Sequence, residues 1–166
     1  MVAQAEVIPG LAPRRQTLGR TVIKWVPSPD HKTSGYLDLI TSFILCGLGG
    51  RRARVIRAEL FEPGIQIVQS KEQYNQLFTM HGTIMLLLFA TPLFAGFANV
   101  IMPLQIGAPD VAFPRLNMFA YWLYLDGGII ASAGGFTPQG AASFGWFAYA
   151  PLSNTTWRAG LGRGSW

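Results

Sequence analysis

The sequence predicts an all-α integral membrane protein with about three spanning helices. Half of the 166 residues are hydrophobic and 13% are charged, about half the charged fraction of an ordinary soluble domain. The stretch from Tyr74 to Pro109 contains no Asp, Glu, Lys or Arg. The 19 glycines and 11 prolines lie among Leu, Ile and Phe, a mixture that packed membrane helices tolerate.

The first apolar segment, Leu37 to Gly50, is short for a membrane span. As a helix it would cover ~21 Å, against ~30 Å of hydrocarbon. An extension to Leu60 takes in four arginines, each of which would cost about 2.5–3.5 kcal/mol at a helix centre. These are Arg51, Arg52, Arg54 and Arg57. We therefore expect this segment to insert poorly on its own.

The second and third segments are better candidates. A helix from Leu77 to Leu104 would cover ~42 Å, which predicts a tilted or kinked span with Pro92 at the kink. The segment from Asn117 to Phe136 begins with aromatic residues, as is typical at a membrane interface, and is interrupted by Asp126. After Pro138 the chain is rich in Gly, Ser and Thr, which favours a loop at the membrane surface.

The two ends and the charge balance complete the organisation. Residues 1–29 are polar and predict a flexible N-terminal tail without the apolar core of a cleavable signal. The net charge of +5 comes from basic residues that flank apolar segments, so we expect lipid headgroups as partners and no nucleic acid. With the cluster at 51–54 set aside, the basic residues favour an N-terminus in the cytoplasm. Because Cys46 is the only cysteine, no internal disulfide can form.

His81 is the group inside the long apolar stretch that titrates near neutral pH. An ionisable side chain inside a membrane helix is a functional candidate, and neutral imidazole is a common ligand of haem iron. Gly82 removes bulk beside it. Ile84, Met85 and Leu88 share its helix face, where they could pack on a flat apolar ring. A histidine hydrogen-bonded between two helices is the structural alternative.

Long stretches of the sequence resemble a known family. The runs QYNQLFTMHGTIM at 73–85 and FANVIMPLQIGAPDVAFPRLN at 97–117 resemble subunit I of haem–copper cytochrome c oxidases, particularly the bacterial haem-a type. Shorter matches are Asp30-His31-Lys32, Arg57-Ala58-Glu59-Leu60 and Phe144-Gly145-Trp146. The resemblance covers residues 30–152 and implies a fragment of that transmembrane domain, with residues 153–166 as a divergent C-terminal loop.

The resemblance implies cofactor-binding roles. His81 matches the first axial ligand of the low-spin haem a. Arg57 matches the arginine at the formyl group of that haem, and Trp146 a tryptophan beside its propionates. Glu59 and Gly64 match positions that hold a calcium or sodium ion in many members. The structural alternatives are a solvated helix end for Arg57 and Glu59 and an interfacial anchor for Trp146.

The resemblance also implies a proton pathway. Asp110 matches the carboxylate at the mouth of a proton-uptake channel, with Asn99 and Asn117 as asparagines of that mouth. Asn side chains can order water without adding charge. The structural alternative for Asp110 is a turn residue. His31 is expected at the protein surface.

The implied function is that of part of the catalytic subunit of a respiratory terminal oxidase, a cytochrome c oxidase of the bacterial plasma membrane. Such an enzyme passes electrons from cytochrome c or a bound cytochrome through the low-spin haem to oxygen and pumps protons, together with subunits II and III. The ligands of the second, oxygen-reducing haem and of copper are absent, because His31 is the only histidine besides His81. This chain alone is therefore expected to be inactive.

Some positions depart from the family pattern, and two other functions stay open. Apolar residues are usual in the family where this chain has Arg51, Arg52, Arg54 and Asp126. The alternatives are a small haem-binding membrane protein, in which two copies each contribute His81, and a non-functional remnant.

Overall fold

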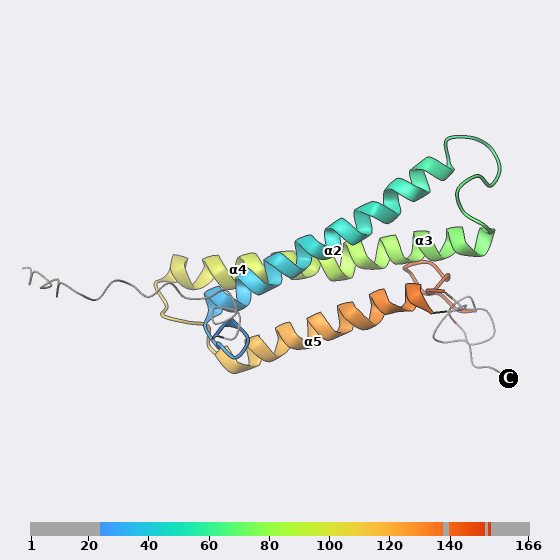
Figure 1. Ribbon diagram of the computed structural model, residues 1–166. Helices are drawn as coiled ribbons and strands as arrows, with labels where there is room; N and C mark the ends of the chain where they lie inside the picture. The colour runs from blue at the N-terminus through green and yellow to red at the C-terminus, as the bar shows by residue number, and fades with distance from the viewer. Residues whose placement is uncertain (1–23, 138–139, 152, 154–166) are drawn as a thin grey trace, which may run out of the picture.

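The computed structural model describes residues 24–137, 140–151 and 153, and in them the chain forms three long helical rods (Figure 1). The elements are α2 (His31–Glu59), α3 (Lys71–Thr83), the π-helical η1 (Ile84–Ala90), α4 (Thr91–Ile106), α5 (Pro114–Ala133) and the 3-10 turn η2 (Gly134–Phe136). The segments α3, η1 and α4 form one continuous rod that returns alongside α2. The all-α prediction is confirmed for the described residues.

The predicted tail and C-terminal loop fall mostly outside the described residues. Of the tail, residues 24–29 are described: Lys24 and Trp25 are helical, and the backbone N–H of Ser28 donates to the carbonyl of Trp25 at 3.3 Å. Of residues 153–166, only Ser153 is described. Both predictions remain untested.

Helix α2 is the element on which the others pack. It contacts α3, η1, α4 and α5, whereas α5 packs mainly against α2. Its start is fixed by Asp30, whose side chain accepts a hydrogen bond from the backbone N–H of Thr33 at 3.0 Å, the usual chemistry of a helix N-cap. The first segment thus runs over 29 residues, well beyond the apolar stretch that predicted it.

The crossing of α2 and α4 depends on two glycines. A Cβ atom added at Gly35 would lie 2.9 Å from the carbonyl oxygen of Gly96, and one added at Gly96 would lie 3.0 Å from the carbonyl oxygen of Gly35. Small residues at a crossing let two helix backbones approach closely, as membrane helices commonly do. The side chains beside these glycines, Asp38 on α2 and Asn99 on α4, are brought together by this approach.

The long rod is irregular where it passes α5. Its π-helical segment ends two residues before Pro92, and the backbone N–H of Thr91 donates to Leu86, five residues back. Because Pro92 has no N–H, it cannot donate to the carbonyl of Leu88. The hydroxyl of Tyr124 on α5 donates to that carbonyl instead, at 2.8 Å. Pro92 was predicted to mark a kink, and a π-helical turn next to it is a recognised cause of one.

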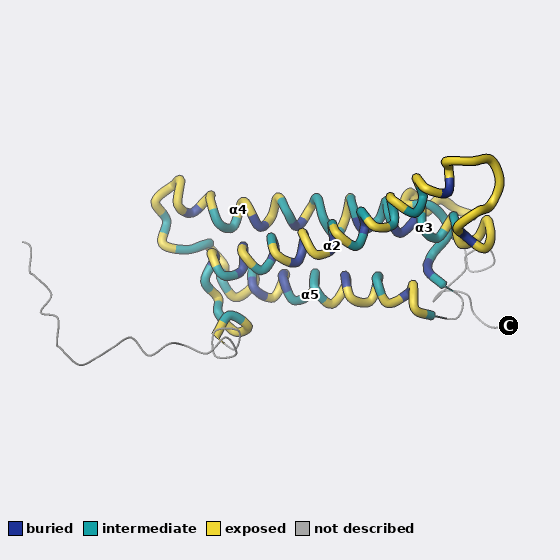
Figure 2. Tube along the Cα trace, turned by 45° about the horizontal axis from the view of Figure 1, so that its top comes forward, coloured by how far each residue is buried: buried dark blue, intermediate teal, exposed yellow. Residues whose placement is uncertain are grey.

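The burial pattern of α2 is the reverse of that in a water-soluble helix. Its polar residues His31, Ser34, Asp38 and Ser42 are each at most 6% exposed, whereas Phe43 is 59% and Ile44 61% exposed. In Figure 2 the exposed positions follow the outward sides of the rods. A helix in water turns its apolar side inward, so this surface suits lipid or further apolar helices.

The predicted spans differ in how well they suit a membrane. Among the described residues, one helix is long and apolar enough to cross a membrane, the 36-residue rod Lys71–Ile106. Helix α5 has 20 residues and a length of ~30 Å. The part of α2 before Arg51 also covers ~30 Å, so the following arginines can lie at the edge of the hydrocarbon with their charged ends in water. The poor insertion expected for α2 stays a prediction.

The loop from α2 to α3 is organised by one carboxylate. Oε1 of Glu59 accepts the backbone N–H of Gln66 at 2.9 Å, and Oε2 accepts those of Ile67 and Val68 at 2.7 and 3.0 Å. Burial alone would raise the pKa of Glu59, but the N–H groups of Val68, Gln66 and Ile67 outweigh it and hold the pKa below its ordinary value of 4.5. Gly64 provides the positive φ of 111° that the turn requires.

We predict that Gly35→Ala destabilises the bundle by about 1–3 kcal/mol, because the new methyl group must displace the α4 backbone. The matched control is Gly47→Ala on the same helix, where an added Cβ meets nothing within 4 Å. Stability is measured by titrating the purified protein with a denaturing detergent. Equal midpoints for the two variants would contradict the role of the glycine crossing.

We predict that the 66–68 turn is held at neutral pH and loosens in acid. Since the pKa of Glu59 is lowered, its contribution is complete above pH 4.5 and is lost as the pH falls through the lowered value. Glu59→Gln should speed amide hydrogen exchange of Gln66 and Val68 at neutral pH, after correction for intrinsic rates. Glu62→Gln in the same loop should not change it, because the main-chain carbonyl of Glu62 makes the contact with Gln66. Equal exchange in both variants would show that the carboxylate does not hold the turn.

Candidate functional site

His81 is fixed by a backbone carbonyl across the α2–α3 interface. Its Nδ1 lies 3.0 Å from the carbonyl oxygen of Gly49. A carbonyl oxygen only accepts hydrogen bonds, so Nδ1 carries a proton, and in the neutral imidazole Nε2 then keeps a free lone pair. Nε2 has no hydrogen-bond partner among the described residues. This is the arrangement in which a histidine is oriented by one ring nitrogen and can ligate a metal with the other.

The predicted cofactor residue Trp146 lies beside Gly82, the residue that follows His81 in α3. A Cβ added at Gly82 would lie 3.0 Å from Cβ of Trp146. Gly82 was predicted to make room for the edge of a macrocycle, and in the structure it makes room for this tryptophan. The loop is tied to α3, since the backbone N–H of Gly145 donates to the Thr79 hydroxyl at 2.9 Å. Trp146 is 41% exposed and stacks on Phe147 with ring centroids 4.3 Å apart.

The apolar residues predicted to pack on a ring beside His81 have other neighbours. Ile84 is fully buried in a cluster with Leu45, Met80 and Ala141, and Leu88 packs against that cluster. Met85 lies against Gly49 of α2, where an added Cβ would be 2.7 Å from its sulfur. These side chains therefore close the space between α2 and the rod on this side of His81.

Arg57 lies apart from His81. It is exposed on the last turns of α2, ~12 Å along the helix axis from the level of Gly49. Glu59 and Gly64 lie further on, in the loop held by the Glu59 carboxylate. The structure thus places Trp146 beside Gly82, the residue that follows His81, and does not bring Arg57, Glu59 or Gly64 into contact with His81.

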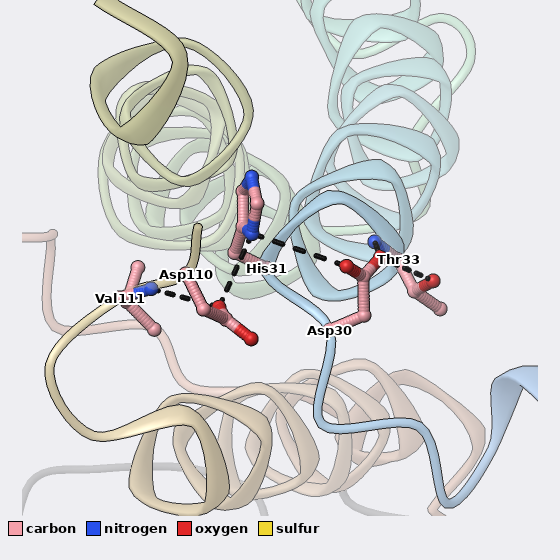
Figure 3. A network of polar contacts seen from close by, with 5 residues as sticks. All are labelled: Asp30, His31, Thr33, Asp110 and Val111. Carbon is pink, nitrogen blue, oxygen red and sulfur yellow. Dashed lines mark hydrogen bonds and ion pairs between the residues drawn. The ribbon is translucent and has the colours of Figure 1, made fainter. Parts of the chain in front are cut away.

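The second group of polar residues lies at the other end of α2, around Asp110. Oδ1 of Asp110 is 3.1 Å from Nδ1 of His31 and accepts the backbone N–H of Val111 at 2.7 Å. The same nitrogen of His31 is 3.9 Å from Oδ1 of Asp30. Figure 3 shows the His31 ring between the two carboxylates. The surface position predicted for His31 is wrong: the residue is 2% exposed, because the α4–α5 loop covers the start of α2.

Asp30 is held in its charged form. Partial burial raises its pKa, but hydrogen bonds from the backbone N–H and the hydroxyl of Thr33, with His31 and Lys32 nearby, keep the pKa below its ordinary value of 3.8. It therefore faces His31 as a permanent negative charge near neutral pH.

Of the predicted asparagines, Asn99 contacts α2 and Asn117 lies on α5. Nδ2 of Asn99 donates to Oδ2 of Asp38 at 3.2 Å, and Asp38 is 6% exposed. Nδ2 of Asn117 is buried without a protein partner among the described residues, as are Oγ of Ser34 and Nε2 of His31. Buried polar groups of this kind are commonly satisfied by internal water. The geometry can therefore support a line of polar side chains and internal waters that runs inward from Asp110.

Two tyrosines of α5 continue the polar contacts of α2. The hydroxyls of Thr41 and Tyr121 lie 3.1 Å apart, and those of Ser42 and Tyr124 lie 3.4 Å apart. Residues 31, 34, 38, 41 and 42 follow helical spacing, and we call them the polar stripe. Sequence reasoning missed His31 and Asp38, although this spacing inside an apolar segment was a signal that could have found them.

Comparison with known proteins agrees with the arrangement. Residues 33–164 match the family described as Cytochrome C and Quinol oxidase polypeptide I, so the match continues past residue 152, where the resemblance was expected to end. The chain is 65% identical over 153 residues to a probable cytochrome c oxidase subunit 1-alpha of Streptomyces avermitilis, covering 92% of this chain and 26% of that protein. It is 57% identical over 137 residues to a cytochrome c oxidase subunit 1 of Corynebacterium efficiens, covering 82% of this chain and 23% of that protein.

The chain therefore spans about a quarter of the length of these curated relatives. Its match to the family extends over most of its own residues. The match includes the helix that carries His81, the loop with Asp110 and the polar stripe from Ser34 onward. This chain belongs to the cytochrome c and quinol oxidase polypeptide I family.

Proposed function

We propose that this chain is part of the catalytic subunit of a terminal oxidase, in which His81 binds a low-spin haem and Asp110 admits protons. The observation that carries the proposal is the bond from Nδ1 of His81 to the Gly49 carbonyl, which leaves Nε2 available to iron. A bound haem a would supply one-electron transfer at this end of the bundle. The protein's own contribution is to fix the imidazole tautomer and to bury its surroundings.

The other proposed haem contacts are Trp146 and Arg57. Trp146 packs beside Gly82, the residue that follows His81 in the chain, and this supports a role near the proposed haem ligand. Arg57 is exposed and further along α2, so a role at the rim of the haem is supported by the family resemblance alone. The second haem and the copper would take their ligands from outside this chain, because the other histidine here, His31, faces Asp110.

Electron transfer from cytochrome c to oxygen, proton pumping and assembly with subunits II and III are proposed for the whole protein of which this sequence would be part. We propose three spanning helices in the plasma membrane. His31 at the start of α2 contacts Asp110, so proton uptake at Asp110 would occur at the same end as the start of α2, which supports a cytoplasmic N-terminus. A calcium or sodium ion at Glu59 and Gly64 is also proposed; it would share a carboxylate that already accepts three backbone N–H groups.

We predict that His81→Ala removes the low-spin haem absorption band from membranes that contain the protein, because no other described side chain lies where Nε2 does. His31→Ala, the change at the other histidine, is the matched control and should keep the band. Haem content is measured from reduced-minus-oxidised spectra. A band that survives His81→Ala would overturn the ligand assignment.

The same preparation distinguishes the rival functions. A native polypeptide that contains residues 73–85 and is several times larger than 18.1 kDa supports the oxidase subunit. A stable 18.1 kDa species with one haem per two chains supports the small haem-binding protein. An 18.1 kDa species without haem, rapidly lost from membranes, supports the remnant.

We predict that Asp110→Asn slows proton uptake by the assembled oxidase, since the amide cannot collect protons where the bundle meets water. The expected decrease is about tenfold or more. Asp126→Asn, on the exposed side of α5, is the matched control and should leave uptake unchanged. Uptake is followed with a pH-sensitive dye during turnover, and an unchanged rate in Asp110→Asn would contradict the proposal.

A further inference from the structure

We infer that Asp38 is a second proton-holding carboxylate, which receives protons inside the bundle after they pass Asp110. The inference rests on the proposed proton uptake at Asp110 and adds a residue to it. The observation that carries it is a carboxylate buried in the centre of the polar stripe and bound by the proposed channel residue Asn99.

The surroundings of Asp38 suit a group that gains and loses a proton. It is 6% exposed, and the partner that the structure gives it is the neutral amide of Asn99, 3.2 Å from Oδ2. A carboxylate inside a membrane with a neutral partner is costly to keep charged, and binding a proton removes that cost. The glycine crossing of Gly35 and Gly96 lies beside it and holds α2 against α4.

A polar line joins Asp110 to Asp38. His31 lies 3.1 Å from Asp110, and in Figure 3 the other ring nitrogen of His31 points away from both carboxylates. That nitrogen and the hydroxyl of Ser34 are buried without protein partners among the described residues. From His31 through Ser34 to Asp38 the stripe covers ~10 Å along α2, a distance that a few internal waters can bridge.

The line does not continue through Tyr124. Its hydroxyl donates to the Leu88 carbonyl at 2.8 Å, and a carbonyl cannot pass a proton on. The hydrogen bond from Ser42 to Tyr124 therefore cannot extend the path for protons, and it serves helix packing. Beyond Ser42 the interior is apolar, with Leu45 and Ile84 in the buried cluster. Asp38 is thus the last carboxylate on the line within the described residues.

The step itself is a simple proton transfer. A proton carried by water binds a carboxylate oxygen of Asp38, so one O–H bond forms on the carboxyl group as one breaks on hydronium, and the carboxylate becomes neutral. Release to the next acceptor reverses the step. No electron moves and no further reactant is needed.

The test uses the oxidase complex that contains this chain, reconstituted in lipid vesicles. Asp38→Asn is informative because an amide oxygen can still accept the hydrogen bond from Asn99, so a purely structural role predicts no change. We expect it to slow proton uptake about tenfold, less than the ~100-fold typical of a group that transfers protons directly to substrate. Asp38→Glu should restore uptake to within about threefold of the native rate. Asp126→Asn is the matched intramembrane control and should behave as native.

The outcomes separate the inference from the function on which it rests. Slow uptake in both Asp110→Asn and Asp38→Asn, with rescue by Asp38→Glu and an unchanged haem spectrum, supports the inference. Slow uptake in Asp110→Asn but a native rate in Asp38→Asn overturns it and leaves the proposed function standing. Native rates in both variants overturn both proposals.

A second measurement covers the case in which Asp38→Asn also loses haem. Infrared spectra of the native complex and of Asp38→Glu are compared in the carboxyl C=O region. A band of a protonated carboxyl group that shifts in Asp38→Glu supports the inference. A carboxyl region that is identical in the two proteins overturns it.

Discussion

The approach of α2 to α4 at Gly35 and Gly96 is the contact on which the rest of the structure depends. With no side chain at either position, the two backbones come close enough for Asn99 to reach Asp38. Apolar side chains gain little by leaving lipid for a helix interface, so such helices associate through close packing and hydrogen bonds. The buried polar stripe of α2, with its tyrosine partners on α5, supplies those hydrogen bonds. One helix therefore provides both the cohesion of the bundle and the polar groups of the candidate proton line.

The two candidate sites lie toward opposite ends of the bundle and are built differently. The His81 end is assembled by loops and glycines: the Gly49 carbonyl orients the ring, and Gly82 admits Trp146. The Asp110 end is assembled by side chains from the start of α2 and from the α4–α5 loop, with His31 buried at its centre. Between them lies the apolar cluster around Leu45 and Ile84, where neither water nor a charged group would be stable.

The helices and the family could be predicted from the sequence because each depends on local pattern. Apolar length predicted the long rod, and extended motif runs predicted the family. The partners of the side chains could not be predicted in this way. His31 appeared to be a surface residue because it follows a polar tail, and only the loop after α4 buries it.

Two further features could not be predicted, for similar reasons. The first span was drawn too short because the residues before Leu37, such as His31 and Ser34, are polar, although both are buried. The hydrogen bond from Tyr124 to the Leu88 carbonyl depends on an N–H that Pro92 lacks, together with a helix that begins more than twenty residues later in the chain. Such contacts follow from tertiary packing.

The apolar cluster between the two ends also has an electrical consequence. Asp38 and the level of Gly49, where His81 is held, are ~16 Å apart along α2, with low-polarity packing between them. At that separation, a unit charge at one end changes the energy of a unit charge at the other by on the order of 1 kcal/mol, for an effective dielectric constant of about 20. The cluster thus keeps the ends chemically separate while leaving each within the electric field of the other, so that a change of charge at one is felt as a change of potential at the other.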